Sequence, residues 1–241
     1  MAATGCAAYR AFAGVTRRST LLRETGKSAG DIMTIRLAGL TLFDNKAGSN
    51  TKRVRMYLAE KGLEIPRENV EFSKLEHRTP EFRKINPMAA LPVLRLEDGS
   101  YLAESCAICR YLEEFHPNPP LFGTTPKERA VIEMWNRRIE LDVASYVTSF
   151  VKHQQPFFAE VLTQVPDYVE ACRHDALKKF DWLNADMEGR DYIAGDDFTV
   201  VDITTYARLS TGKHLGLFFT DRHPNLLRWW ERIERRPSAL A

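Results

Sequence analysis

The sequence has few cysteines and no long apolar run. Its four cysteines, Cys6, Cys106, Cys109 and Cys172, are too few and too scattered for a disulfide framework in a chain of 241 residues, so a reducing compartment fits best. The longest apolar stretches, such as residues 143–151, are interrupted by Ser, Thr and Tyr and fall short of the ~20 residues that a membrane-spanning helix requires. No membrane segment is therefore predicted.

The chain also lacks an excess of charge of either sign. It has 34 Lys and Arg residues against 32 Asp and Glu residues, which gives a formal charge of +2. This balance gives no reason to expect nucleic acid or an anionic membrane surface as a partner. With 44% apolar and 27% charged residues, the composition is that of a folded globular protein long enough for two domains. A small-molecule substrate fits these properties best.

Residues 1–32 differ in composition from the rest of the chain. They hold five basic residues against two acidic ones, Glu24 and Asp31, together with many Ala, Ser, Thr and Gly. An organelle transit peptide has this composition. An upstream start codon, with Met33 as the true initiator, explains it equally well. We treat residues 1–34 as an extension outside the fold and expect a cytoplasmic protein, or a mitochondrial or other organellar one if the extension is a transit peptide.

Residues 35–116 have the pattern of an α/β domain in the order βαβαββα. Apolar alternation and turn signals predict strands at 35–43, 69–72, 93–96 and 101–102, the last two joined by a hairpin turn at Asp98-Gly99. Apolar spacing and capping residues, among them Gly62 and Thr79, predict helices at 51–61, 80–85 and 104–115.

The second half of the chain is predicted to be helical. Residues 117–126 hold four prolines and one glycine and are predicted to be a linker. Helical periodicity then predicts an all-helical domain, residues 127–241, with helices at 127–152, 167–187, 199–209 and 224–236. Thr199 and Asp202 have the spacing of a capping box at the start of the third of these helices.

Two dipeptides are candidates for ligand binding. Pro92 cannot donate to a sheet, so the Leu91-Pro92 step belongs at a strand start or an edge; if its peptide bond is cis, the Leu91 N–H and carbonyl point out of the sheet and can pair with an extended peptide. At the start of the helix 104–115, free N–H groups and the Ser105 hydroxyl suit a carboxylate, and Glu104 suits an ammonium group. The alternatives are a strand-start proline, a capping serine and a first-turn acid without further function.

The cysteine pair Cys106 and Cys109 has the CxxC spacing of a redox site, but it follows the hairpin rather than the first strand and lies in a helix that buries one face. Buried structural cysteines explain the pair better. No second Cys or His pair at ligand spacing accompanies them, so no metal site is predicted, and motifs such as GxGxxG, the P-loop and GxSxG are absent.

These segments together resemble the glutathione S-transferase superfamily, most closely its bacterial and plant theta- or phi-like members. The resemblance extends from about Leu40 to the carboxyl terminus. It is carried by RVRMYLAEKGLE, by EHRTPEF followed by INP, by ALPVLRLEDGSYLAESCAICRYLEE and by FTVVDIT. It implies a thioredoxin-like domain with a mixed sheet that binds glutathione as co-substrate, joined to an all-helical domain that holds a small electrophile. It also implies a homodimer.

The resemblance implies a role for six residues in glutathione binding. Glu104 and Ser105 would hold the γ-glutamyl end of the tripeptide, and Leu91 before a cis-Pro92 would pair with the cysteinyl backbone. His77 and Arg78 would reach the glycine carboxylate, for which an arginine is well suited; a solvated loop pair is the alternative for these two.

The sequence departs from the family at the residue that stabilises the glutathione thiolate. Counted back from Arg53 and Val54, the position of the phi and theta serine falls on Gly48, which has no side chain for that task. Three alternatives stay open: the Ser49 hydroxyl, the Asn50 amide as in nu-like and yeast prion-like relatives, or a weak enzyme with a poorly stabilised thiolate. Asn50 ranks slightly above Ser49 because it aligns without a shift. Capping residues without a catalytic role are a further possibility for both.

The predicted function is therefore that of a glutathione transferase. It would bind reduced glutathione, stabilise its thiolate by hydrogen bonding and deliver it to a small electrophile, without nucleic acid, membrane or metal. Two alternatives are a glutathione-dependent disulfide reductase or peroxidase, and a noncatalytic glutathione-binding module.

Overall fold

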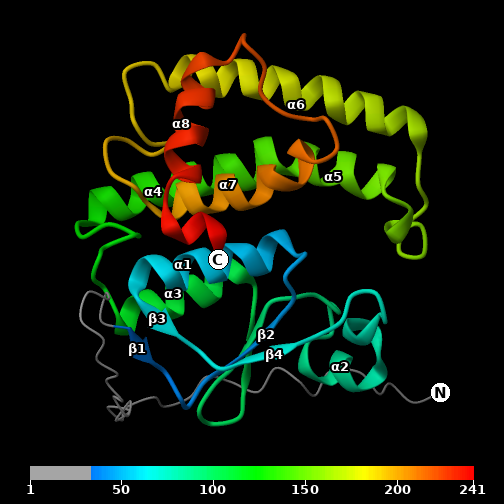
Figure 1. Cartoon of the computed structure of the whole chain (residues 1–241), viewed down its shortest axis with the longest axis vertical. Coiled ribbons are helices and arrows are strands. Elements are labelled where there is room, and N and C mark those ends of the chain that lie inside the picture. The colour runs from blue at the N-terminus through cyan, green and yellow to red at the C-terminus, as the bar shows by residue number, and fades with distance from the viewer. Residues whose placement is uncertain (1–33) are drawn as a thin grey trace, which may run out of the picture.

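The computed structural model describes residues 34–241, and Figure 1 shows them as two halves stacked on each other. The half nearer the N-terminus holds the strands β1 to β6, and the other half is helical. Except for Thr34, the predicted extension lies outside the described residues, and so does Cys6. Between residues 34 and 241, none of the helices combines the length and the apolar character needed to cross a membrane.

The first half follows the predicted βαβαββα order, except that the first strand is divided in two and a short strand that was not predicted follows the first helix at residues 63–64. Its strands are β1 (Ile35–Arg36), β2 (Thr41–Asp44), β3 (Leu63–Glu64), β4 (Arg67–Asn69), β5 (Val93–Arg95) and β6 (Tyr101–Ala103). Its helices are α1 (Ser49–Lys61), α2 (Pro80–Ile85) and α3 (Ser105–Phe115), with a 3-10 turn at Glu76–Arg78. The larger sheet has the order β4-β2-β5-β6, in which β2 and β4 are parallel and β5 is antiparallel to both of its neighbours. This is the mixed sheet of a thioredoxin-like domain.

Two strand predictions are wrong in their bounds. The stretch 35–43 is broken by a turn in which the Leu40 N–H donates to the Leu37 carbonyl, so that β1 pairs with β3 and β2 pairs with β4. The strand expected at 69–72 is β4, which ends at Asn69 because its partner β2 ends at Asp44. Beyond it the chain turns, and the Phe72 carbonyl accepts a bond within that turn instead of in a ladder.

Helices α1 and α3 lie between the sheet and the helical half (Figure 1). Met56 and Tyr57 on α1 and Ile108 and Cys109 on α3 are completely buried in the core that they share. Gly62 ends α1 in the left-handed conformation, with φ of 59°, as the sequence predicts. Because both helices are held by this core, their N-terminal ends have fixed positions at the edge of the sheet.

The second half consists of five α-helices, and one of the four predicted helices is divided. They are α4 (Pro126–Arg138), α5 (Ala144–Gln154), α6 (Pro166–Asp186), α7 (Val200–Lys213) and α8 (Pro224–Glu234), with short 3-10 turns at Pro156–Phe158 and Pro237–Leu240. The single helix predicted at 127–152 is α4 and α5 joined by a π-helical segment, Ile139–Val143. Such wide turns often occur at functional sites. α7 continues four residues beyond its predicted end, and the domain boundaries at residues 116 and 127 stay a prediction.

Two helices of this half begin with capping boxes. Thr199 and Asp202 form the predicted box at α7, and Thr125 and Glu128 form a second box at α4. The Asp202 carboxylate is completely buried, accepts from its own helix start and is also the acceptor for the indole N–H of Trp229 on α8 at 2.8 Å. One side chain therefore joins α7 to α8.

Candidate functional site

The loop before α1 is held by hydrogen bonds and leaves Gly48 as the residue that begins the helix. The Asn45 side chain donates to the Val70 carbonyl at 2.8 Å and accepts from the Ala47 N–H at 2.9 Å. Gly48, the N-cap of α1, has no side chain with which to cap the helix. An anion at this helix start would meet free N–H groups and the positive end of the helix dipole.

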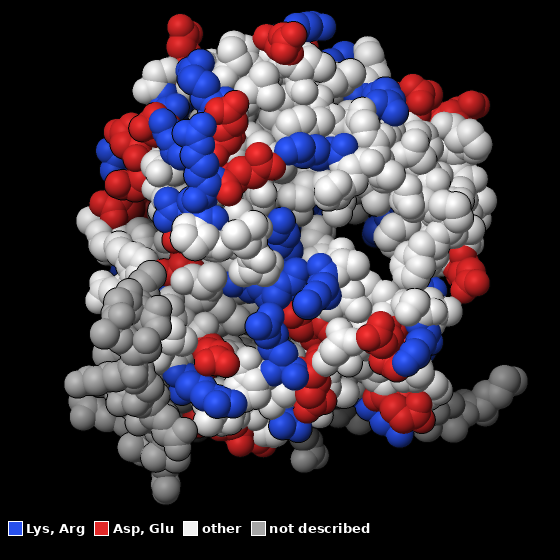
Figure 2. Space-filling model, viewed as in Figure 1, with Lys and Arg blue, Asp and Glu red and all other residues white. Residues whose placement is uncertain are grey.

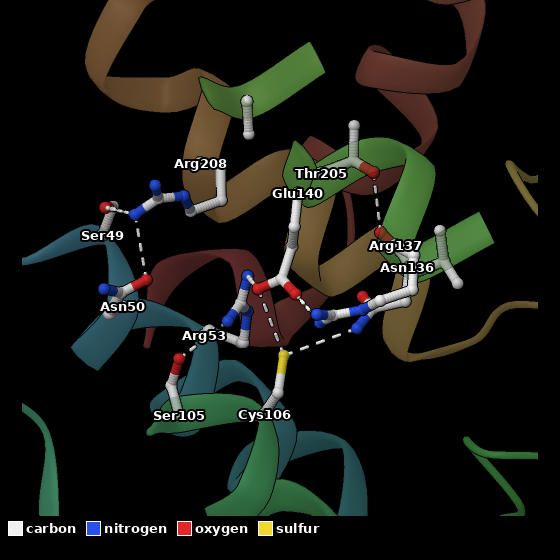
Figure 3. A network of polar contacts seen from close by, with 12 residues as sticks. Ser49, Asn50, Arg53, Ser105, Cys106, Asn136, Arg137, Glu140, Thr205 and Arg208 are labelled. Carbon is white, nitrogen blue, oxygen red and sulfur yellow. Dashed lines mark hydrogen bonds and ion pairs between the residues drawn. The ribbon is translucent and has the colours of Figure 1, made fainter. Parts of the chain in front are cut away.

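Ser49 and Asn50, the two candidates for binding the thiolate, are the first residues of α1 and are half-buried. The Arg208 guanidinium on α7 contacts both: Nη1 donates to Asn50 Oδ1 at 3.0 Å and to Ser49 Oγ at 3.3 Å (Figure 3). Its Nη2 donates to Thr148 Oγ1 on α5 at 2.6 Å. Figure 2 shows a hollow between the two halves beside this helix start. Arg208 was not identified from the sequence, because helical spacing alone does not distinguish it from a solvent-facing arginine.

The absence of a serine at Gly48 has a steric reason. A Cβ atom at Gly48 would lie 2.6 Å from Thr51 Oγ1, and Thr51 is completely buried with its hydroxyl against the Asn45 carbonyl. We expect Gly48→Ser to destabilise the fold by about 1–3 kcal/mol, because the Thr51 hydroxyl has to leave its buried partner. Urea unfolding measures this change, and a glutathione conjugation assay is expected to show no gain in activity.

The control for this prediction is Thr51→Ala, which removes the obstructing hydroxyl. Gly48→Ser introduced together with Thr51→Ala is expected to cost less than Gly48→Ser alone. Strictly additive costs in this double-mutant cycle would show that Thr51 is not the obstacle.

Glu104 and Ser105 stand at the start of α3, as the sequence predicts. Ser105 is buried and its Oγ accepts a bond of 2.7 Å from Arg53 Nη1, which leaves the Ser105 O–H as a donor. Glu104 is exposed and has φ of 68° and ψ of 111°, a positive-φ conformation that is uncommon for a residue other than glycine. Backbone strain of this kind concentrates at functional sites.

Arg53 connects the starts of α1 and α3 to the π-helical segment. It is buried, and its Nη2 forms an ion pair of 2.9 Å with Glu140 Oε1 (Figure 3). Cys106 contacts the same carboxylate, since its Sγ lies 3.4 Å from Glu140 Oε1. Burial raises the pKa of the Cys106 thiol. No sequence pattern distinguishes Arg53 from Arg55 on the same helix, which pairs with Asp44 instead.

His77 and Arg78 lie in the 3-10 turn before α2. His77 is buried, its ring meets the Phe72 ring edge-on with centroids 4.9 Å apart, and its Nε2 accepts from Arg78 Nε at 3.2 Å. Burial, followed by the charges of Arg78 and Arg83, lowers the pKa of His77, so the imidazole is neutral at pH 7 and carries its proton on Nδ1. Within the described residues this Nδ1 has no hydrogen-bond partner.

The Leu91-Pro92 peptide bond is cis. The Leu91 side chain is buried in a cluster with Phe43, Phe82 and Val93. Among the hydrogen bonds of residues 34–241, none involves the backbone of Leu91. Its N–H and carbonyl are therefore unpaired, as strand-like binding of an extended peptide requires.

Side-chain contacts link the candidate residues of the helix starts, the 3-10 turn and the cis-proline step to one another. Arg53 of α1 reaches Ser105, and the Cβ position of Gly48 lies 3.5 Å from the Phe72 ring, which touches His77. Phe72 also packs on the cluster that contains Leu91. The structure thus brings the sequence-predicted residues to the side of the sheet where α1 and α3 begin. No cluster of three or more His, Cys, Asp or Glu residues suited to a metal ion occurs in the part of the chain that the structure describes.

A thioredoxin-like half followed by an all-helical half is the arrangement of a known class of proteins. Residues 47–114 match the glutathione S-transferase N-terminal domain, and residues 134–237 match the glutathione S-transferase C-terminal domain. The chain belongs to the glutathione S-transferase superfamily, a family of enzymes, as its sequence motifs indicate.

Several relatives of this chain carry the same fold over most of their length. Glutathione S-transferase 2 of Saccharomyces cerevisiae is 34% identical over 203 residues, which are 83% of this chain and 87% of that protein. The crystal structure of Gtt2 from the same yeast has a TM-score of 0.76 and covers 83% of this chain and 98% of its own. A glutathione S-transferase domain-containing protein from Marinobacter aquaeolei is 36% identical, with a TM-score of 0.77 over 82% of this chain and 98% of its own.

Proposed function

We propose that this protein transfers the thiolate of reduced glutathione to a small electrophile. The observation that carries the proposal is the start of α1, where the side chains of Ser49 and Asn50 stand beside an uncapped helix end and the hollow between the two halves. A thiol is a poor nucleophile, and donors directed at its sulfur favour the charged form. Either side chain can supply such a donor.

The other predicted residues would hold the tripeptide along one path. The backbone of Leu91, which precedes cis-Pro92, would pair with the cysteinyl backbone of glutathione, and Ser105 and Glu104 would bind the carboxylate and the ammonium group of the γ-glutamyl end. His77 and Arg78 would meet the glycine carboxylate. Each of these assignments opposes a charge or a donor of glutathione with a complementary group.

In the proposed reaction the thiol proton passes to solvent and the sulfur electron pair attacks an electrophilic carbon. A sulfur–carbon bond forms, and the leaving group departs with the electron pair of the broken bond. Binding both reactants in the hollow between the halves would supply proximity and exclude water from the sulfur. The protein residues described above would bind, orient and stabilise the reactants.

The proposal is tested by titrating the ultraviolet absorbance of the bound thiolate against pH. We expect the midpoint to lie below the pKa of about 8.5 of an unperturbed thiol in the wild type and to rise by about one unit in Asn50→Ala. Ser49→Ala serves as the matched comparison at the same helix start and is expected to shift the midpoint less. An unchanged midpoint in Asn50→Ala would remove Asn50 from the thiolate site, and a larger shift in Ser49→Ala would assign the role to Ser49.

The second candidate function is glutathione-dependent reduction of disulfides, which the amide of Asn50 and the absence of a hydroxyl at Gly48 favour. Here the thiolate attacks a disulfide sulfur, a mixed disulfide forms and a substrate thiolate leaves. Conjugation and disulfide-reduction assays run in parallel separate the two activities. Retention on glutathione-agarose with neither activity would indicate the noncatalytic binding module instead.

The family also suggests an assembly and a location for this protein. We propose a homodimer in a reducing compartment, the cytoplasm unless the amino-terminal extension directs the protein to an organelle. Light scattering of the purified protein measures the first, and sequencing the mature amino terminus from cells tests the second.

A further inference from the structure

Arg208 of α7 is the residue through which the helical half reaches the proposed thiolate site. α7 packs against both α1 and α5, and the guanidinium bridges these two helices. Its Nη1 donates to Asn50 Oδ1 at 3.0 Å and to Ser49 Oγ at 3.3 Å, while its Nη2 donates to Thr148 Oγ1 at 2.6 Å. The Thr148 hydroxyl in turn donates to the Ala144 carbonyl, so the guanidinium is anchored on α5.

This contact determines which atoms of Ser49 and Asn50 face a ligand. A guanidinium can only donate, so it occupies the oxygen of the Asn50 carboxamide and turns the Nδ2 amide group away, as Figure 3 shows. In the same way the Ser49 oxygen accepts from Arg208 and keeps its own proton for another acceptor. Both residues are therefore left as donors, which is the property that a thiolate site needs.

Arg208 also brings a positive charge that is not paired directly with a carboxylate. Within residues 34–241 it forms no ion pair, and the nearby Glu140 of the π-helical segment is engaged by Arg53 and Arg137 instead. The other titratable groups that act on it are Arg53 of α1 and Cys106 of α3. Burial, followed by the charge of Arg53, lowers the pKa of Arg208 to about 10, so the guanidinium is charged at neutral pH.

We infer that Arg208 is a positioning residue of the thiolate site: it orients the Asn50 amide and the Ser49 hydroxyl towards the glutathione sulfur and favours the thiolate by its unpaired charge. The inference rests on the proposed function. It adds a residue from the helical half to a site otherwise built from the first half, so the site is complete only when the two halves are packed together.

The test compares the thiolate titration and the steady-state kinetics of wild type, Arg208→Met and Arg208→Lys. We expect Arg208→Met to raise the midpoint of the thiolate titration by about one unit, and therefore to lower the thiolate fraction about tenfold at a pH below both midpoints. The loss in kcat/KM should shrink as the pH rises, because the thiol then ionises without help. The KM for glutathione should change little, since Arg208 contacts none of the residues proposed to bind the peptide ends.

Arg208→Lys keeps the charge but its single ammonium group cannot reach Ser49, Asn50 and Thr148 together. The midpoint of the thiolate titration in Arg208→Lys is expected to lie between those of the wild type and Arg208→Met. If Arg208→Met does not fold, the comparison of Arg208→Lys with the wild type provides the test. Lys213→Met is the matched control, because it removes one positive charge from the last turn of the same helix, where Lys213 pairs with Glu234 at 2.8 Å. It should leave the midpoint unchanged.

A wild-type midpoint in any folded Arg208 variant overturns the inference, and so does an activity loss that is equal at every pH. Failure of the proposed function gives a different result: the wild-type protein itself then shows no thiolate absorbance with glutathione. The two failures are therefore distinguishable in one set of titrations.

Discussion

Replacing Asp202 with alanine is expected to lower the free energy of unfolding by about 3–5 kcal/mol, a large effect for one polar side chain. The carboxylate is completely buried and accepts from the N–H groups of Ile193 and Thr199, each at 2.9 Å, and from the Trp229 indole N–H at 2.8 Å. Alanine would leave three buried donors without an acceptor, and each of them costs about 1–3 kcal/mol.

The chain offers a matched control in its second capping box. Glu128 holds the same position in α4 as Asp202 in α7, but it is exposed and its partners are exposed loop residues. Glu128→Ala is expected to lower the free energy of unfolding in urea much less than Asp202→Ala, because water replaces the exposed carboxylate as acceptor. Equal losses in the two variants would show that the cap alone, and not the buried network, explains the importance of Asp202.

Asp202 also predicts a dependence of stability on pH. Burial raises the pKa of its carboxyl group to about 6 in the folded protein, above the value of about 3.9 in an unfolded chain. The folded state therefore binds the Asp202 proton more tightly than the unfolded state does. The stability that this proton binding contributes is fully present below about pH 4 and is lost as the pH rises through about 6. Asp202→Asn should lack this component, and unfolding experiments across that range measure the difference.

Replacing Ser105 with alanine is expected to weaken glutathione binding about 10–100-fold, the largest effect on function among the predictions. The Ser105 oxygen accepts from Arg53 at 2.7 Å, so its proton is free for the γ-glutamyl carboxylate. A hydrogen bond to a charged group contributes about 1.5–3 kcal/mol, which corresponds to that range of affinity. The KM for glutathione should rise while kcat at saturation changes little, because Ser105 is not proposed to contact the sulfur.

Two further variants decide whether this loss comes from the hydroxyl. Ser105→Thr keeps a hydroxyl at the helix start and should recover most of the affinity. Ser100→Ala removes an exposed hydroxyl from the turn between β5 and β6, where it bonds to Asp98, and should have no effect. Wild-type affinity in Ser105→Ala, measured by calorimetry, would exclude Ser105 from the binding site.

The secondary structure was predicted correctly where helix caps and turns require particular residue types. Gly62, the Thr79 cap with Pro80, the Asp98-Gly99 turn and the Thr199 box all lie where the sequence predicts them. The errors have long-range causes. β4 ends where its partner β2 ends, and the long helix contains a π-helical segment whose residues pack on other helices. No local pattern carries this information.

The candidate site shows the same division. Motif resemblance predicted Leu91, Glu104 and Ser105 as binding residues, because each belongs to a motif of residues that are adjacent in the chain. Arg53 and Arg208 were missed, since an arginine in a helix usually faces solvent and only tertiary packing shows that these two do not. Arg208 contacts residues 158 and 159 positions away in the chain.

The sequence by itself determined the class of fold, the starts and ends of most helices, and the family, because capping, turn chemistry and apolar spacing act between residues close together in the chain. Only the tertiary structure decided that Gly48 has no room for a side chain, that Arg53 joins Ser105 to Glu140, and that Arg208 holds both candidate thiolate-binding residues. Buried polar groups must find partners wherever packing places them, and those partners come from distant parts of the chain.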